Sequence, residues 1–219
     1  HYVISNGGDQ PNVVPSFASV WYFIREITAE NIMENFATLQ RVAEGAAMMT
    51  DTTVSRKIVG AAWPRHFNRP IALAMNENIK AVGLPTWSED DQRFAKALQT
   101  LMGSDNPQGL ATDLSGIAEP LETPVSGGSD DIGDISWNVP TVTLRYPANV
   151  SGLQGHHWSS AMAMATPIAH KGATAGAKVV AATMLDLIQD PSLVSDAQTY
   201  FDEVQTAEVQ YEPFIGPDD

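Results

Sequence analysis

The sequence predicts a fold of the α/β class, in which a sheet with one helix on its face precedes a helix-rich part. Two observations lead to this prediction. Over residues 1–63, short runs of β-branched and aromatic residues alternate with an amphipathic helix, an order typical of a two-layer α+β unit. Farther along, residues 166–188 form one long predicted helix rich in alanine and glycine, and we expect it to pack closely against a sheet.

The N-terminal part is predicted to form strand, strand, helix and strand in that order. The stretches 1–4, 17–25 and 52–61 are rich in strand-forming residues. Thr28 is expected to cap a helix that runs to about Met49, because apolar side chains recur behind it at three- and four-residue steps. A split βαβ pattern would add a strand and a helix before the first residue, so we expect a piece of a longer chain.

The rest of the chain is predicted to be mostly helical. Helices are expected over residues 71–83, 88–101, 166–188 and 192–208. Gly83 is typical of a helix end, and Ser88, followed by acidic residues, of a helix start. One more strand is expected over 141–146. The stretch 103–122 is long for a connection, which indicates a functional or mobile loop, and a basic patch, 65–69, lies at a hinge-like position.

The composition argues against several classes of function. With 12 Lys and Arg against 26 Asp and Glu, the net charge is −14. This disfavours nucleic acid and anionic membrane surfaces as partners, since both are bound by clustered positive charge. The chain has no cysteine, which excludes disulfide scaffolds and cysteine-based metal sites or nucleophiles. No apolar run approaches the ~18 residues of a membrane span, and we expect a cytoplasmic protein.

Two adjacent histidines, His156 and His157, lie on a glycine-flanked loop. A loop lets one imidazole turn inward, so the pair suits a metal ligand or a general base. The alternative is a pair of loop histidines with ordinary hydrogen bonds. No HxH, HExxH or HxD pattern completes a metal site, and the lack of a GxSxG elbow argues against a serine hydrolase.

Two further groups of residues suit the binding of a carboxylate. The glycine-rich turn 127–131 can present backbone N–H groups to a substrate, or it is a tight strand-to-helix turn capped by Asp130. His1, Asn12 and Arg25 form the second group, because a guanidinium at a strand end suits bidentate carboxylate binding. The alternative there is a surface charge with two turn residues.

Three segments together resemble the dinuclear-zinc amidohydrolases and exopeptidases, a superfamily that includes glutamate carboxypeptidases, aminoacylases and desuccinylases. The stretch from His1 to Arg25 resembles the lid (dimerisation) domain of that superfamily, and the turn 127–131 resembles the substrate-binding turn of its catalytic domain. The third segment holds GHHW (155–158) and TPIAHKG (166–172), which with SDDIGDISW (129–137) are closest to the branch of p-aminobenzoyl-glutamate hydrolase B subunits. The resemblance covers nearly the whole chain.

The resemblance implies part of an α+β, ferredoxin-like lid or dimerisation domain in residues 1–66. Residues 67–219 would form the C-terminal half of a zinc-peptidase-like α/β catalytic domain. Two divalent metal ions, Zn in the family, would be bound by His156 and by ligands that mostly lie outside this chain. His1 would stabilise the oxyanion in the partner subunit's site of a homodimer. The residues implied to hold the substrate are Asn12, Arg25, Gly128 and Ser129.

The implied activity is that of a metal-dependent amidohydrolase acting on a small carboxylate-bearing substrate, of the N-acyl amino acid, aminobenzoyl-glutamate or dipeptide type. The family's other metal ligands and its general-base glutamate lie in an earlier half. We therefore expect this chain alone to be inactive and a missing N-terminal half to complete the site. The alternatives are a non-catalytic subunit or interaction module that kept the fold, and a carboxylate-binding protein, which would need Arg25 and the turn but not His156.

Overall fold

The protein is mainly helical with one two-stranded sheet in the residues that the structure, a computed structural model, describes: 1–117 and 128–216. The chain divides into two compact units. Unit 1 comprises His1–Arg65, Pro120–Asp134 and Glu212–Asp219, and unit 2 comprises His66–Glu119 and Ile135–Tyr211. The division into a lid over 1–66 and half a catalytic domain over 67–219 stays a prediction.

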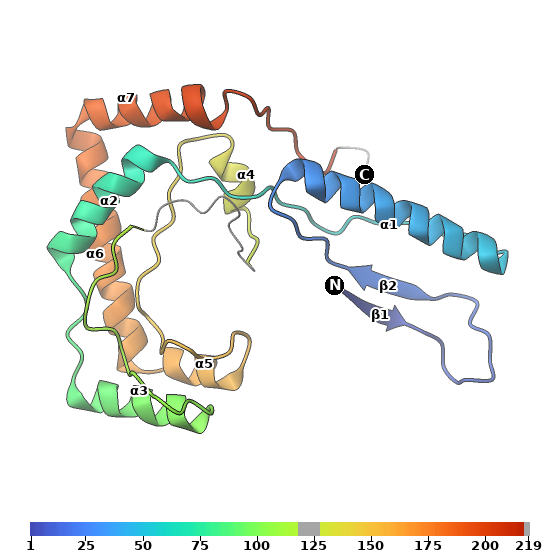
Figure 1. The fold of residues 1–219 in the computed structure, drawn as a ribbon, viewed down its shortest axis with the longest axis horizontal. Coiled ribbons are helices and arrows are strands. Elements are labelled where there is room, and N and C mark those ends of the chain that lie inside the picture. Colours follow the sequence, from blue (N-terminus) through green and yellow to red (C-terminus); the bar gives the residue numbers. More distant parts are fainter. Residues whose placement is uncertain (118–127, 217–219) are drawn as a thin grey trace. The chain divides into compact units, whose positions relative to one another are not determined.

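Unit 1 begins with an antiparallel hairpin, in which β1 (Tyr2–Asn6) pairs with β2 (Ser19–Tyr22) (Figure 1). The first two predicted strands are thus confirmed, although the second is shorter than predicted. Tyr2 and Tyr22 oppose each other across the ladder, with ring centroids 5.6 Å apart. The hairpin nevertheless leaves most of its large apolar side chains exposed, namely Tyr2, Val3, Ile4, Val20, Trp21 and Phe23.

Helix α1 (Ala29–Thr50) follows the hairpin and confirms the predicted amphipathic helix. The Thr28 hydroxyl caps it by accepting a hydrogen bond from the Asn31 N–H at 3.2 Å. The helix ends at Asp51, which takes a left-handed conformation with φ 52°. No residue of α1 is buried, so this helix contributes little to a core.

The strands predicted over 52–61 and 141–146 are wrong, because the structure describes both stretches and assigns a strand to neither. Strand propensity measures how well side chains suit a paired, half-buried surface, and pairing requires a neighbouring strand. In the described part of the chain, the one sheet is that of β1 and β2. The α/β class is therefore supported only in coarse form.

Unit 2 is an assembly of helices. Helix α2 (Arg69–Val82) packs against α6 (Pro167–Gln189) and α7 (Pro191–Tyr200), and α5 (Trp158–Met164) packs on α6 (Figure 1). Helix α3 (Glu89–Leu101) supplies part of a buried cluster that comprises Ala95, Leu98, Leu110, Val150, Ala163 and Ile168.

Three elements of the structure were not predicted from the sequence, and helix α5 (Trp158–Met164) is one of them. The short helix α4 (Ile132–Ser136) begins in unit 1 and ends in unit 2. A π-helical turn (Phe201–Gln205) continues α7, where the sequence predicts one regular helix to residue 208. None of the helices in the described ranges is long and apolar enough to cross a membrane.

The start of α3 links local sequence to packing. Ser88 and Asp91 form a reciprocal capping box: the Ser88 hydroxyl accepts from the Asp91 N–H at 3.2 Å, and the Asp91 carboxylate accepts from the Ser88 N–H at 2.8 Å. The same buried carboxylate pairs with Lys171 of α6. Burial opposes the charge of Asp91, but the hydrogen bonds from Lys171 and Ser88 outweigh it and hold its pKa below the ordinary value.

Close packing of the alanine- and glycine-rich helix, now α6, is confirmed at its glycines. A Cβ on Gly172 would lie 2.1 Å from the Pro147 carbonyl oxygen, and a Cβ on Gly176 would lie 3.3 Å from Tyr146 Cβ. The expected sheet on this face is wrong, because α6 contacts the extended segment 144–148 and α2 instead.

Candidate carboxylate-binding site

The register of the hairpin places Arg25. Phe23 extends the pairing beyond β2: its N–H donates to the His1 carbonyl at 2.8 Å, and the His1 ammonium donates to the Phe23 carbonyl at 3.0 Å. The Arg25 guanidinium lies over the Phe23 ring, 5.1 Å from its centroid. Arg25 therefore leaves the hairpin at the end where His1 lies.

The same guanidinium reaches the glycine-rich turn. Nη1 of Arg25 donates to the Ser129 hydroxyl at 3.2 Å, across 104 positions of sequence. Both residues are exposed. Two of the residue groups that the sequence predicts for carboxylate binding therefore meet within unit 1. Gly127, the first residue of the predicted turn, lies outside the described residues, and 128–131 lie inside them.

A second arginine, to which the sequence alone assigned no site, contacts the turn on both sides of Ser129. Arg65 donates from Nη2 to the Gly128 carbonyl at 3.3 Å, and its Nη1 lies 3.6 Å from Oδ2 of Asp130. The Arg65 side chain is 12% exposed. The basic patch 65–69 was the signal that could have identified Arg65, but a run of charges does not specify a partner.

The far end of the turn is held by hydrogen bonds and by close packing. The Asp130 carboxylate accepts from the Ile132 N–H at 3.2 Å and its carbonyl accepts from the Gly133 N–H at 3.2 Å. The predicted alternative, a turn capped by Asp130, is thus also observed. Gly133 lies against Trp63 so closely that a Cβ there would be 1.9 Å from the Trp63 carbonyl oxygen.

Trp63 is itself fixed by two contacts with the C-terminal segment of unit 1. Its indole N–H donates to the Glu212 carbonyl at 2.7 Å, and its ring stacks on Phe214 with centroids 5.5 Å apart. Trp63 is buried. The segment that carries Trp63 and Arg65 is therefore the support on which the turn rests.

The other two lid residues of the predicted site, His1 and Asn12, also belong to unit 1. His1 is exposed at the start of the hairpin, and Asn12 is exposed in the connection between β1 and β2. In the part of the chain that the structure describes, no hydrogen bond joins either side chain to Arg25 or Ser129. Their roles in oxyanion and substrate binding stay predictions.

His156 and His157 belong to unit 2 and differ in their surroundings. His157 caps α5, where its Nδ1 accepts from the Ser159 N–H at 3.3 Å and lies 2.9 Å from the Ser159 hydroxyl. His156 is exposed and takes a left-handed conformation with φ 55°, which is uncommon for a residue other than glycine. The role of His156 as a metal ligand stays a prediction.

A dinuclear metal centre does not fit the residues that the structure describes. Among them, no group of three or more His, Asp or Glu side chains could hold a metal ion. A zinc ion is bound by four protein ligands, or by three protein ligands and a water molecule. His156 could contribute one ligand, and the rest of such a centre would have to be supplied by other residues.

His66, next to Arg65 in sequence, is held in an aromatic environment within unit 2. Its ring lies 5.7 Å from that of Trp137 and 6.1 Å from that of Tyr200, measured between centroids. Burial lowers the pKa of His66 below its ordinary value, and a backbone hydrogen bond at Phe67 partly opposes this shift. Its buried Nδ1 has no hydrogen-bond partner among the described residues. These surroundings favour the neutral form of the His66 imidazole.

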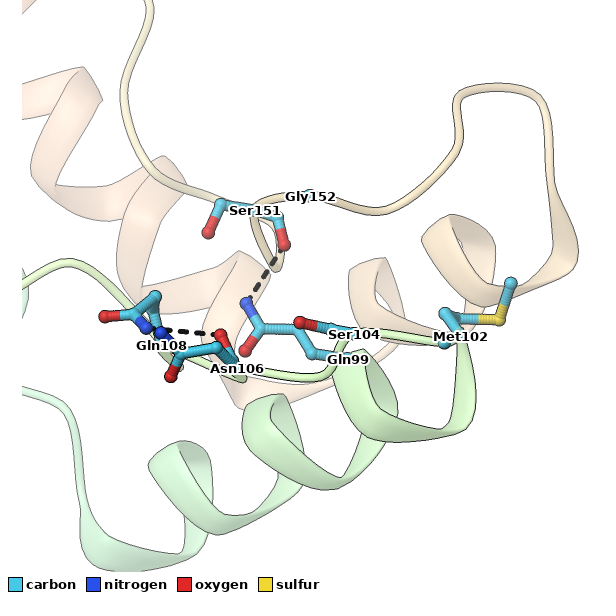
Figure 2. Close-up of a pocket in the computed structure, with 8 residues that line it drawn as sticks. Gln99, Met102, Ser104, Asn106, Gln108, Ser151 and Gly152 are labelled. Atoms are coloured by element: carbon cyan, nitrogen blue, oxygen red, sulfur yellow. Dashed lines mark hydrogen bonds between the residues drawn. The ribbon is translucent and has the colours of Figure 1, made fainter.

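Unit 2 also contains a pocket of about 320 Å³ that includes none of the predicted site residues. Figure 2 shows its uncharged lining, which includes Gln99, Ser104, Asn106, Gln108 and Ser151. The Gln99 amide crosses it: Nε2 donates to the carbonyls of Ser151 at 3.0 Å and Gly109 at 3.2 Å, and Oε1 accepts from the Gly109 N–H at 2.7 Å. We interpret these bonds as structural.

The arrangement in unit 1 suits recognition of an anion. Two guanidiniums converge on a three-residue turn, Gly128 to Asp130, and each presents N–H donors in a planar fork that matches a carboxylate. The exposed Ser129 hydroxyl adds a further donor. The Arg25 guanidinium and the Ser129 hydroxyl can bind and orient a carboxylate-bearing molecule, and the contacts of Arg65 hold the turn.

Comparison with known proteins identifies relatives that are hydrolases by name. The chain is 30% identical to the B subunit of p-aminobenzoyl-glutamate hydrolase from Escherichia coli (strain K12), over 93% of this chain and 47% of the relative. It is 24% identical to the Xaa-Arg dipeptidases of Mus musculus and Homo sapiens, over 92% of this chain and 40% and 39% of theirs. The chain thus spans less than half the length of these curated relatives. No protein-family profile matches it, and no solved structure does.

Proposed function

The chain belongs to the amidohydrolase superfamily, and on that premise we propose that the complete protein hydrolyses an amide bond of a small, carboxylate-bearing substrate. The substrate classes are N-acyl amino acids, aminobenzoyl-glutamate and dipeptides. The observation that supports this proposal most is the contact of Arg25 with Ser129 on the glycine-rich turn, because it assembles a carboxylate-binding group from distant parts of the chain.

This chain's contribution to the reaction is to bind and orient the substrate. The Arg25 guanidinium would bind the substrate carboxylate, and the Ser129 hydroxyl and the backbone around Gly128 would fix its direction. Asn12 would add an amide donor. A carboxylate held at a fixed place sets the distance to the amide bond to be cleaved.

His1 would stabilise the negative charge that develops on the amide oxygen. We propose that hydrolysis is metal-dependent and that His156 is one ligand of the metal, which is Zn in the proposed form. Because the described residues do not form a complete metal site, the activation of water would depend on residues beyond those described. The isolated chain would then bind substrate without turning it over.

The hairpin supports a proposed homodimer. Tyr2 is 68% exposed, Ile4 62% and Trp21 50%, and a lone two-stranded hairpin is only marginally stable in water. A second copy of the hairpin would cover these side chains and would carry His1 into the partner's site. In fold terms we propose that 1–66 is part of a lid domain and 67–219 half of an α/β catalytic domain.

The proposed function is tested in the complete protein with p-aminobenzoyl-glutamate and an N-acyl glutamate as substrates. We expect hydrolysis that a chelator abolishes and that added zinc restores. The variant His156→Ala should lose bound metal and activity, whereas His170→Ala, an exposed histidine on α6, should keep both. A metal-free, inactive but folded wild-type protein would favour the alternative of a non-catalytic subunit.

A further inference from the structure

We propose that Arg65 is a positioning residue for the carboxylate site: it sets the conformation of the turn 128–130 so that the Ser129 hydroxyl meets Arg25. This inference rests on the proposed function, because it assigns the turn a substrate to bind. Arg65 contacts Gly128 and Asp130, the two neighbours of Ser129 in the chain, so it would act through the turn.

The geometry of the contacts between Arg65 and the turn supports this role. Arg65 contacts the residue on each side of Ser129, with Nη2 3.3 Å from the Gly128 carbonyl oxygen and Nη1 3.6 Å from Asp130 Oδ2. Because the two nitrogens belong to one planar guanidinium, their contacts fix both the position and the orientation of the turn. A lysine ammonium is a point charge and cannot span two such acceptors in the same way.

Arg65 is more buried than its partner in the turn, because the Asp130 side chain is 47% exposed. The Arg65 side chain is 12% exposed, whereas pairs between fully exposed charges contribute little to stability. The segment that carries Arg65 is anchored at Trp63, whose indole is bonded to Glu212 and stacked on Phe214. Through Arg65, the anchored segment therefore holds the turn in place, and Ser129 remains exposed in the turn.

The test uses Arg65→Met and Arg65→Lys in the complete protein, with Arg93→Met as the matched control. Arg93 also pairs with an aspartate, but its side chain is 74% exposed and its partner, Asp90, lies on the same helix. We expect both Arg65 variants to raise hydrogen exchange of the Ile132 and Gly133 amides, whose N–H groups donate to Asp130, and Arg93→Met to leave it unchanged. Exchange needs no activity, so it tests the positioning role even if no substrate is turned over.

The second readout is steady-state hydrolysis of p-aminobenzoyl-glutamate. Loss of about one charge-assisted hydrogen bond would raise KM about tenfold, with kcat nearly unchanged, because binding rather than bond cleavage is impaired. If Arg65 acts through the turn, Arg65→Met should have a much smaller effect in a Ser129→Ala background, which is the non-additivity expected of coupled residues.

The outcomes separate the two proposals. Faster exchange of the Ile132 and Gly133 amides together with the coupled rise in KM supports the role of Arg65. Unchanged exchange in a folded Arg65→Met variant overturns it, and so does faster exchange with an unchanged KM. If the wild-type complete protein hydrolyses no amide and binds no carboxylate, the proposed function fails. Faster exchange in the Arg65 variants would then show only that Arg65 fixes the conformation of the turn.

Discussion

Replacing Gly172 by alanine should destabilise unit 2. The new Cβ would lie 2.1 Å from the Pro147 carbonyl oxygen and 2.6 Å from Ala148 Cα. Both opposing atoms belong to the backbone and cannot rotate away, so the segment or the helix must move by about 1 Å to restore an ordinary contact. Overpacking of this kind costs about 1–3 kcal/mol, and the higher helix propensity of alanine returns about 1 kcal/mol. We expect a net loss of stability of up to about 2 kcal/mol.

The assay is urea unfolding followed by circular dichroism, with the free energy compared at equal m-values. Gly176→Ala is the control on the same helix, because its Cβ would meet a side-chain atom, Tyr146 Cβ, at 3.3 Å. That variant should be as stable as wild type or more stable by up to about 1 kcal/mol. Equal stabilities of the two variants would refute the close approach of segment 147–148 to α6.

Three further predictions concern local contacts. Asp91→Asn should lower the free energy of unfolding at neutral pH by about 1–2 kcal/mol. The folded-state pKa of Asp91 is lowered, so the stability contributed by its ionised carboxylate is lost as the pH falls through that pKa. The difference between variant and wild type should therefore shrink in acid. The pKa of His66 is lower in the folded protein than in the unfolded chain, so the unfolded chain is protonated at a higher pH. Wild-type stability should therefore fall as the pH drops below about 6.5. In urea titrations at several pH values, His66→Gln should remove this dependence of stability on pH. Gly133→Ala should speed hydrogen exchange of the Ile132 amide, which donates to Asp130, because its Cβ would lie 1.9 Å from the Trp63 carbonyl oxygen, whereas Gly45→Ala, with nothing within 4 Å, should not.

Features encoded in short stretches of sequence were predicted well. The Thr28 cap of α1 and the helix start at Ser88 depend on a side chain and a backbone N–H three residues apart, so the local pattern suffices to predict them. The strands over 52–61 and 141–146 failed for the opposite reason, because a strand depends on a partner that may lie anywhere in the chain. The Gly172 approach to Pro147 was foreseen only as a tendency of small residues to pack closely.

For the candidate site, too, single residues were predicted but contacts between distant residues were not. The resemblance assigned Arg25 and Ser129 separately, but the hydrogen bond between them joins residues 104 positions apart and follows from the fold. Arg65 was missed because a basic patch shows charge and not the carbonyl or carboxylate that the charge will contact. The contacts of Arg65 with Gly128 and Asp130 became visible only when the turn was placed beside it.

The central claim is that Arg25 and the glycine-rich turn recognise a substrate carboxylate. The most direct test is the ratio of kcat/KM for p-aminobenzoyl-glutamate to that for the analogue with its α-carboxylate converted to a carboxamide. The complete protein should favour the carboxylate by about a hundredfold, the value of a strong charge-assisted pair, and Arg25→Met should reduce this preference to a few-fold, with Arg93→Met unchanged. A preference that survives Arg25→Met intact would contradict the account.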